Sequence, residues 1–113
     1  MAITSTKNRT IGKVLATSNS DVYTVPARWN STVHSLIITN TTSTSKTVSL
    51  EWYDSVNSTW YYLMKDTLLG PNSIMQIEEP LYLIATDQIR GLASANSSVT
   101  VTVKVFEDFA TSL

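Results

Sequence analysis

The sequence has no cysteine, which excludes disulfide bonds and thiolate metal sites. Gly and Pro are also scarce, with three residues of each in 113, so the chain is neither a flexible linker nor a low-complexity segment. No apolar run approaches the roughly 18 residues that a membrane-spanning helix needs. The first ten residues lack an apolar core as well, so we expect no signal peptide and assembly in the cytoplasm.

A strong excess of charge of either sign is missing too. Eight Lys and Arg residues against nine Asp and Glu residues give a formal net charge of −1 at pH 7. Nucleic-acid-binding domains usually carry a basic excess, so we expect no nucleic-acid partner, and the lack of an apolar span argues against a membrane partner. The charges are uneven, because residues 1–46 hold five cations and one carboxylate whereas residues 47–113 hold three cations and eight carboxylates.

Hydroxyl-bearing and β-branched residues are what the chain has in abundance, and Ser plus Thr make up about 28% of it. Thr and Val favour a pleated, half-buried surface, which is typical of β-strands. The clearest example is residues 98–107, where four valines alternate with other residues and therefore share one face of a strand. Residues 33–40 and 46–53 alternate in the same way.

Weaker alternating or apolar segments complete the pattern, and we expect six more strands, at residues 11–17, 22–25, 59–65, 73–78, 81–84 and 88–94. Runs of Ser, Thr, Asn, Asp, Gly and Pro separate the strands, because these residues favour turns over ladders. Strands this short and this evenly spaced predict an all-β fold, an antiparallel β-sandwich of jelly-roll type with about seven to nine strands. The side chains expected to point inward are Leu36, Ile38, Val48, Leu50, Trp52, Val99, Val101, Val103 and Val105.

The expected organisation is a single domain with two short ends. An N-terminal arm over residues 1–10 is mainly polar, so it has little core to join and would become ordered on a neighbouring molecule. The β-sandwich is expected over residues 11–109, and residues 110–113 form a C-terminal tail. The uneven charge has two interpretations: these charges are scattered over the solvated surface, or, in a repeating array, the basic arm with Lys7 and Arg9 lies on an acidic patch of the next copy.

Motifs for catalysis are missing from the sequence. His34 is the only histidine, and neither a Cys nor a second His stands at metal-ligand spacing from it. There is no Gly-rich phosphate loop, no G-x-S-x-G nucleophile motif and no H-E-x-x-H zinc motif. We therefore expect a protein that is not an enzyme and has no catalytic residues, no cofactor and no dedicated metal site. One arrangement stays open, a calcium ion held by Asp54, Asp66 and Asp87 from expected loops.

Two segments, residues 60–64 and 81–85, are apolar on both faces, although a strand of an isolated sandwich needs only one apolar face. Either a loop of the same chain covers the second face, or a neighbouring subunit does. Tyr, Trp and Met are enriched in subunit interfaces, in agreement with the second interpretation. The residues expected to contact other subunits are Tyr61, Tyr62, Met64, Tyr82, Lys7 and Arg9.

Four elements follow one another along the chain. They are Tyr-x-Val-Pro at residues 23–26, Leu-Ile-Ile-x-Asn at 36–40, Val-x-Leu-x-Trp at 48–52 and Leu-x-Leu-x-x-x-Asp-x-Ile at 81–89. In this order, residues 20–107 resemble small β-sandwich virion proteins of tailed bacteriophages, such as capsid decoration (cement) proteins and neck or tail accessory proteins. The fourth element usually has Gly before the Asp, at a tight turn that favours positive φ, and this chain has Thr86 there.

The resemblance implies a structural role in a virion that is assembled in the cytoplasm of a host cell, with no residue-specific site. Within that class we expect a capsid decoration or cement protein, a homo-oligomer that packs against the major capsid protein. The first alternative is a neck or tail component that packs against other neck or tail proteins. The second is a β-sandwich module that binds carbohydrate, and it requires at least two of Trp29, Trp52 and Trp60 to lie coplanar on an exposed face, with Trp52 expected in the core.

Overall fold

Nine antiparallel β-strands make up most of residues 4–110, which are the residues that the computed structural model describes. Each segment predicted as a strand overlaps one of them. Within this range, no helix is long and apolar enough to cross a membrane. The strands are β1 (Thr4–Val14), β2 (Ser20–Thr24), β3 (Trp29–Asn40), β4 (Lys46–Asp54), β5 (Thr59–Leu69), β6 (Ile74–Ile77), β7 (Leu81–Leu83), β8 (Gln88–Ala93) and β9 (Val99–Ala110).

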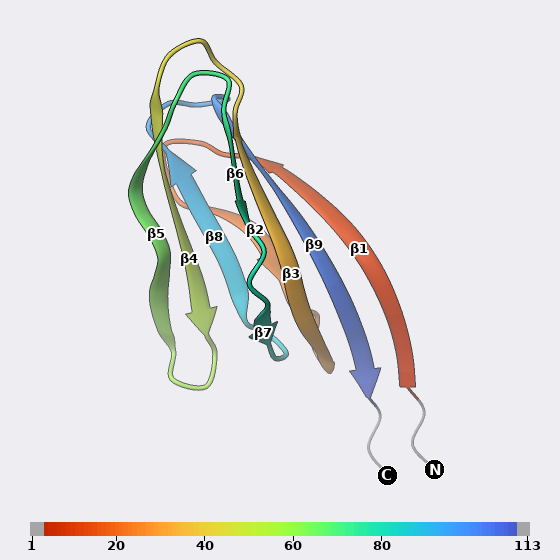
Figure 1. The fold of residues 1–113 in the computed structure, drawn as a ribbon. Coiled ribbons are helices and arrows are strands. Elements are labelled where there is room, and N and C mark those ends of the chain that lie inside the picture. Colours follow the sequence, from red (N-terminus) through yellow and green to blue (C-terminus); the bar gives the residue numbers. More distant parts are fainter. Residues whose placement is uncertain (1–3, 111–113) are drawn as a thin grey trace.

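The strands form two sheets that pack face to face (Figure 1). Sheet A has the order β1-β9-β3-β6, and β7 pairs with β3 along the same edge as β6. Sheet B has the order β2-β8-β4-β5. The chain passes repeatedly from one sheet to the other, and the resulting strand order is that of a jelly roll, with β6 and β7 sharing one strand position. The prediction of an antiparallel, jelly-roll-like β-sandwich is confirmed.

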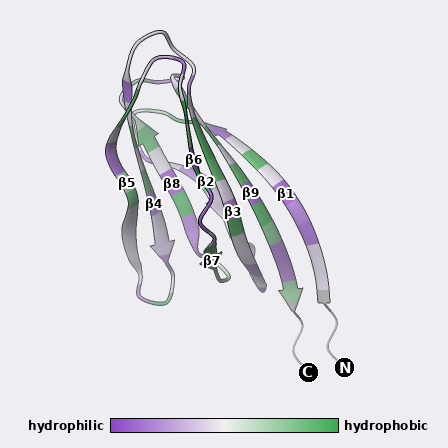
Figure 2. Cartoon of the chain, viewed as in Figure 1, coloured by the Kyte–Doolittle hydropathy of each residue, from purple (hydrophilic) through white to green (hydrophobic). Residues whose placement is uncertain are grey.

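The core lies between the two sheets and is built on the valines of β9. All four point inward and have no exposed surface, and Val48, Leu50 and Ile89 of sheet B are equally buried. Figure 2 shows green apolar positions along β8 and β9, the central strands that carry much of this core. Of the nine residues expected to point inward, eight are buried, whereas Trp52 packs against the core and stays partly exposed. Burial of one such aliphatic side chain contributes about 1.5–3 kcal/mol.

The expected N-terminal arm is part of the sandwich from Thr4 onward, because β1 pairs with β9 along its whole length. The expectation that residues 4–10 become ordered only on a neighbour is therefore wrong. An edge strand is held by backbone hydrogen bonds to the adjacent strand, and its exposed polar side chains give no sign of this in the sequence. Residues 1–3 of the expected arm and 111–113 of the expected tail lie outside the described residues, and Ala110 belongs to β9.

Two irregularities change where side chains point. The register between β3 and β9 shifts between Val33 and Ser35, and His34 is exposed at this bulge. Thr86 has a φ of 71°, in the left-handed region where a β-branched residue is strained. Thr86 therefore makes the tight turn that Gly would make with less strain.

Candidate functional site

A fully buried carboxylate, that of Glu107 on β9, lies between the sheets. Lys7 stands directly opposite Glu107 in the β1–β9 register, and Arg9 is the next residue of β1 on the same face. Arg9 Nη1 lies 3.3 Å from Glu107 Oε2, and Lys7 Nζ lies 3.7 Å from Glu107 Oε1. Both cationic side chains are about half exposed. These two residues, expected to contact another subunit, therefore form ion pairs within their own chain.

The hydroxyl groups of Tyr23 and Ser31 complete this cluster, which we call the Glu107 network (Lys7, Arg9, Tyr23, Ser31 and Glu107). The Tyr23 hydroxyl donates a hydrogen bond to Glu107 Oε2 and also hydrogen-bonds to Ser31 Oγ. Burial, together with the hydrogen bond to the Glu107 carboxylate, raises the pKa of Tyr23 above its ordinary range. Tyr23 comes from β2 of sheet B, whereas Ser31 and Glu107 come from sheet A. The network therefore fastens the two sheets together and has a structural role.

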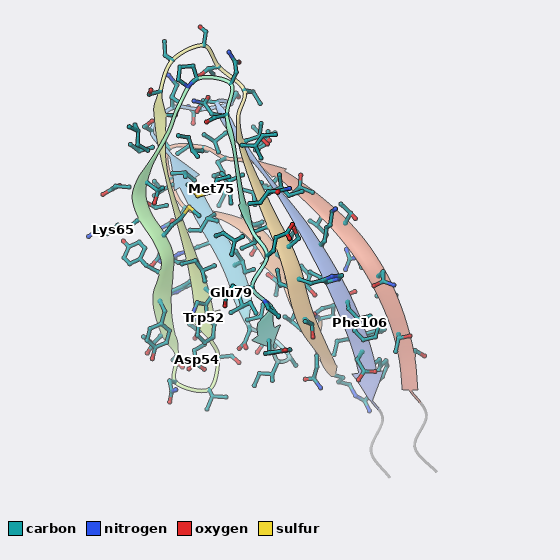
Figure 3. All side chains as sticks on the ribbon, viewed as in Figure 1. Trp52, Asp54, Lys65, Met75, Glu79 and Phe106 are labelled. Carbon is teal, nitrogen blue, oxygen red and sulfur yellow. The ribbon has the colours of Figure 1, made fainter. Side chains whose placement is uncertain are left out.

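The side of the sandwich formed by β5 carries accessible apolar surface. Tyr61 of β5 stacks on Trp52 of β4 with ring centroids 5.3 Å apart, and it remains exposed. Met64 of β5 and Met75 of β6 pack against the core and are partly buried. Figure 3 shows Trp52 and Met75 on this side of the molecule. Two of the expected interface residues, Tyr61 and Met64, stand opposite Trp52 and Leu50 of β4 and therefore share the core-side face of β5.

An aromatic cluster with an ion pair occupies the outer face of sheet B, and we call it the outer cluster (Glu51, Tyr53, Trp60, Tyr62 and Arg90). Tyr53 stands opposite Trp60, and Glu51 stands opposite Tyr62. The Arg90 guanidinium lies 3.7 Å from the centroid of the Trp60 ring, and its Nε lies 3.0 Å from Glu51 Oε1. A guanidinium held between a ring and a carboxylate is a well-ordered arrangement. In the outer cluster, the exposed Tyr62 therefore lies beside side chains that are held in place by these contacts.

Apolar side chains also lie on the outer face of sheet A. Thr32 of β3 pairs with Phe106 on one side and with Tyr82 on the other, so the three form one row across the sheet. Tyr82 is 74% exposed, and Phe106 is exposed as well. Val14 on β1 and Ile74 on β6 lie on the same face, at the two opposite edges of the sheet. This face therefore combines threonines with scattered large apolar side chains.

The six residues expected at a subunit interface do not form one surface. Tyr61 and Met64 are on the β5 side. Of the other four, Tyr62 is in the outer cluster, Tyr82 is on the outer face of sheet A, and Lys7 and Arg9 are in the Glu107 network. Adjacent residues of a strand point to opposite faces, which separates Tyr61 from Tyr62. Sequence reasoning placed Trp60 in the doubly apolar segment 60–64 and in the carbohydrate alternative, but it missed Arg90, Phe106, Val14 and Ile74 as residues of these surfaces. Phe106 did carry a signal, because it alternates out of phase with the valines of β9.

The carboxylates considered for calcium have other partners. Asp87 is buried and accepts a hydrogen bond from the hydroxyl of Ser55. Asp54 accepts a hydrogen bond from the side-chain amide of Asn57, which lowers the pKa of Asp54. Asp66 Oδ1 accepts a hydrogen bond from a serine hydroxyl of β4. Across residues 4–110, no group of three His, Asp or Glu residues is placed to hold a metal ion.

The tryptophans considered for carbohydrate binding lie apart. Trp29 belongs to sheet A and contacts Phe109, with ring centroids 5.1 Å apart. Trp60 belongs to sheet B and contacts Tyr53, with ring centroids 4.9 Å apart. Trp29 is on a different sheet from the other two tryptophans, and Trp52 packs against the core on the opposite face of sheet B from Trp60. A coplanar exposed pair of tryptophans is therefore not formed in the part of the chain that the structure describes.

No protein-family model matches the chain, and no curated protein matches it. Solved structures do share its fold. A chain of the Bacillus endospore appendages, described as disulfide-linked pili, has a TM-score of 0.58 at 13% identity, over 99% of this chain and 92% of its own. A chain from the capsid of Helicobacter pylori bacteriophage KHP30 has a TM-score of 0.54 at 7% identity, over the whole of both chains.

A third similar structure is a chain of the virus-like particle of extra small virus from the giant freshwater prawn Macrobrachium rosenbergii. It has a TM-score of 0.52 at 9% identity, over 93% of this chain and 79% of its own. Identities this low show a shared fold and nothing more. The three similar chains nevertheless come from a pilus, a phage capsid and a virus-like particle, and each of these is an assembly of protein subunits.

Proposed function

We propose that this chain is a structural protein of a virion and acts by packing its β-sandwich against other protein subunits. The observation that carries the proposal is the exposure of large apolar side chains, such as Tyr62, Tyr82 and Ile74, on a fold shared with capsid and pilus chains. Burial of apolar surface in an interface contributes about 25 cal/mol per Å², and exposed apolar patches commonly mark interaction sites. A protein whose role is structural needs exposed surfaces of this kind to pack against other subunits.

Within this class we favour a capsid decoration or cement protein. The similarity to a bacteriophage capsid chain extends over the full length of both chains, which supports this assignment. The resemblance of residues 20–107 to small phage virion proteins supports it as well. A decoration protein binds a preformed shell in many copies, so modest contacts by individual side chains add up through multivalency. A neck or tail component is the alternative, and it would use the same surfaces within a ring.

Co-sedimentation with particles tests the proposal. The full chain is added to shells assembled from the major capsid protein encoded by the same genome, and bound protein is located by electron cryomicroscopy. The variants Tyr62→Ser and Tyr82→Ser each remove one exposed ring, and Val56→Ser is the matched control because Val56 is 73% exposed in the β4–β5 turn. We expect the wild type and Val56→Ser to bind equally, and at least one tyrosine variant to bind about tenfold more weakly.

The location of the density decides between the candidate positions. Density on the capsid surface supports decoration, and density only at the neck or tail supports the alternative. A chain that stays monomeric at every concentration and binds neither shells nor neck and tail proteins would refute a structural role in the virion. Thermal unfolding of each variant provides the control for folding, because all three substitutions replace exposed side chains and should leave stability within about 0.5 kcal/mol.

A further inference from the structure

Sheet A has two free edges. Within residues 4–110, β1 pairs only with β9, and β6 pairs only with β3, so each has one row of backbone N–H and C=O groups without a strand partner. β1 is 11 residues long and contains no proline. A long edge strand without proline can accept a further strand. Figure 1 shows β1 at one border of sheet A and β6 with β7 at the other.

The directions of the two edge strands match each other. The order β1-β9-β3-β6 contains four strands, and each pair of neighbours is antiparallel. β1 and β6 therefore run in opposite directions. If a second copy in the same orientation is placed beside the first, β1 of that copy lies antiparallel to β6 of the first. Antiparallel addition to a sheet edge is a common mode of protein recognition.

The two edges also match in position along the strands. Val14 of β1 pairs with Thr100, which pairs with Thr39, which pairs with Ile74 of β6. Three rows further on, the same path across the sheet leads from the position of Ile11 to that of Ile77. The last four residues of β1 and the four residues of β6 therefore occupy the same rows. Copies placed side by side bring Val14 beside Ile74 without any shift in register.

The side chains at the two edges are complementary. Val14 is 54% exposed and Ile74 is 63% exposed, and both point to the outer face, so they would form an apolar cross-strand pair. β1 carries only basic charges, and Lys13 has no ion pair within the described residues. Glu78 and Glu79, which directly follow β6, are exposed and have no ion pair among the described side chains either. β1 thus carries basic charge and the segment that follows β6 carries acidic charge, which favours association of these two edges over association of like edges.

We propose that β1 of one copy adds to β6 of the next copy, so that sheet A continues from subunit to subunit. This interface deepens the proposed function, on which it rests, and it names a second copy of this chain as the partner. The contact is heterologous, because it joins two different surfaces, and it produces a closed ring or an open filament according to the rotation between copies. Pro80, three residues beyond β6, has no N–H, so an added ladder on this edge does not continue through Pro80 to β7.

Two edge-blocking variants test the proposal in the full chain. Val14→Asp places a carboxylate in the β1 edge, and Ile74→Asp places one in the β6 edge. Val56→Asp is the control, because it adds the same charge to an apolar residue 73% exposed in a turn. Masses are measured by sedimentation across a range of concentrations, and circular dichroism with thermal unfolding checks that each variant folds. We expect the wild type and Val56→Asp to form oligomers and each edge variant alone to dissociate at least about tenfold more readily.

A one-to-one mixture of the two edge variants gives the decisive result. Val14→Asp retains an intact β6 edge and Ile74→Asp retains an intact β1 edge, so the mixture should form heterodimers and nothing larger. If both edge variants assemble like the wild type, or if the mixture does not pair, the edge proposal is overturned. If the wild type is monomeric but binds capsid, neck or tail proteins, the edge proposal also fails while the proposed function stands. Failure of both self-association and such binding would instead count against both proposals.

Discussion

Replacing Glu107 by Gln tests the Glu107 network most directly. The carboxylate is fully buried, accepts a hydrogen bond from Tyr23 and forms ion pairs with the half-exposed Arg9 and Lys7. A hydrogen bond to a charged group contributes about 1.5–3 kcal/mol, whereas an ion pair with an exposed cation contributes about 0–1 kcal/mol. Gln keeps the size and one acceptor oxygen but loses the charge. We therefore expect Glu107→Gln to lower the free energy of unfolding by about 2 kcal/mol, and Arg9→Gln by less than about 1 kcal/mol.

Urea unfolding followed by tryptophan fluorescence and circular dichroism measures these differences. A loss of about 2 kcal/mol corresponds to a fall in the melting temperature of about 6–12 °C for a domain of this size. A double-mutant cycle of Tyr23→Phe with Glu107→Gln should give a coupling energy of about 1 kcal/mol or more, because the two residues share a hydrogen bond. The reasoning is refuted if Arg9→Gln costs as much as Glu107→Gln, or if the cycle shows no coupling.

Alkaline pH, one strained turn and one crowded glycine provide three further tests. Because the pKa of Tyr23 is raised in the folded state, its contribution to stability is complete below the unfolded value of about 10 and is lost as pH rises above it. In urea titrations at pH 9 to 12, the free energy of unfolding should fall more steeply for the wild type than for Tyr23→Phe, and equal slopes would contradict a raised pKa of Tyr23. Thr86→Gly should raise the free energy of unfolding by about 0.5–1 kcal/mol, since the strain removed at this positive φ outweighs the greater conformational freedom of the unfolded chain. A variant with a lower melting temperature than the wild type would show that the turn is not strained. Gly91→Ala should lower the free energy of unfolding by about 1–3 kcal/mol, because a Cβ there would lie 2.5 Å from Leu50 Cδ2 and 3.0 Å from a backbone oxygen. The control is Gly12→Ala, where a Cβ meets nothing within 4 Å, and equal melting temperatures for the two variants would be inconsistent with crowding at Gly91.

Alternation in the sequence predicts the strands and the core because burial imposes a period of two on each strand. The valines of β9 illustrate this, since all four point inward. The start of β1 could not be predicted in the same way. Residues 5–10 are exposed and polar, and residues 4–10 join the sheet through backbone hydrogen bonds that depend on no particular side chain. Lys7 stands opposite the buried Glu107, and Arg9, the next residue on the same face of β1, also forms an ion pair with it; only the register reveals these pairings.

The candidate surfaces were harder to predict than the fold. Period two says which residues of one strand share a face, but it does not say which strands are neighbours. Trp60 and Arg90 are 30 positions apart and meet only because β4 lies between β5 and β8. Tyr82 and Phe106 likewise share a row only through Thr32. Bulges add a further shift of one residue, as at His34, which the sequence does not announce.

The Glu107 network has a consequence for the speed of association. Its ion pairs and hydrogen bonds hold β1 against the rest of the molecule before any partner arrives. A terminal segment that was loose in the free protein would lose conformational entropy on capture, and docking would then be slower and weaker for the same contacts. In this protein β1 becomes ordered during folding, so a partner subunit binds a strand that is already in place.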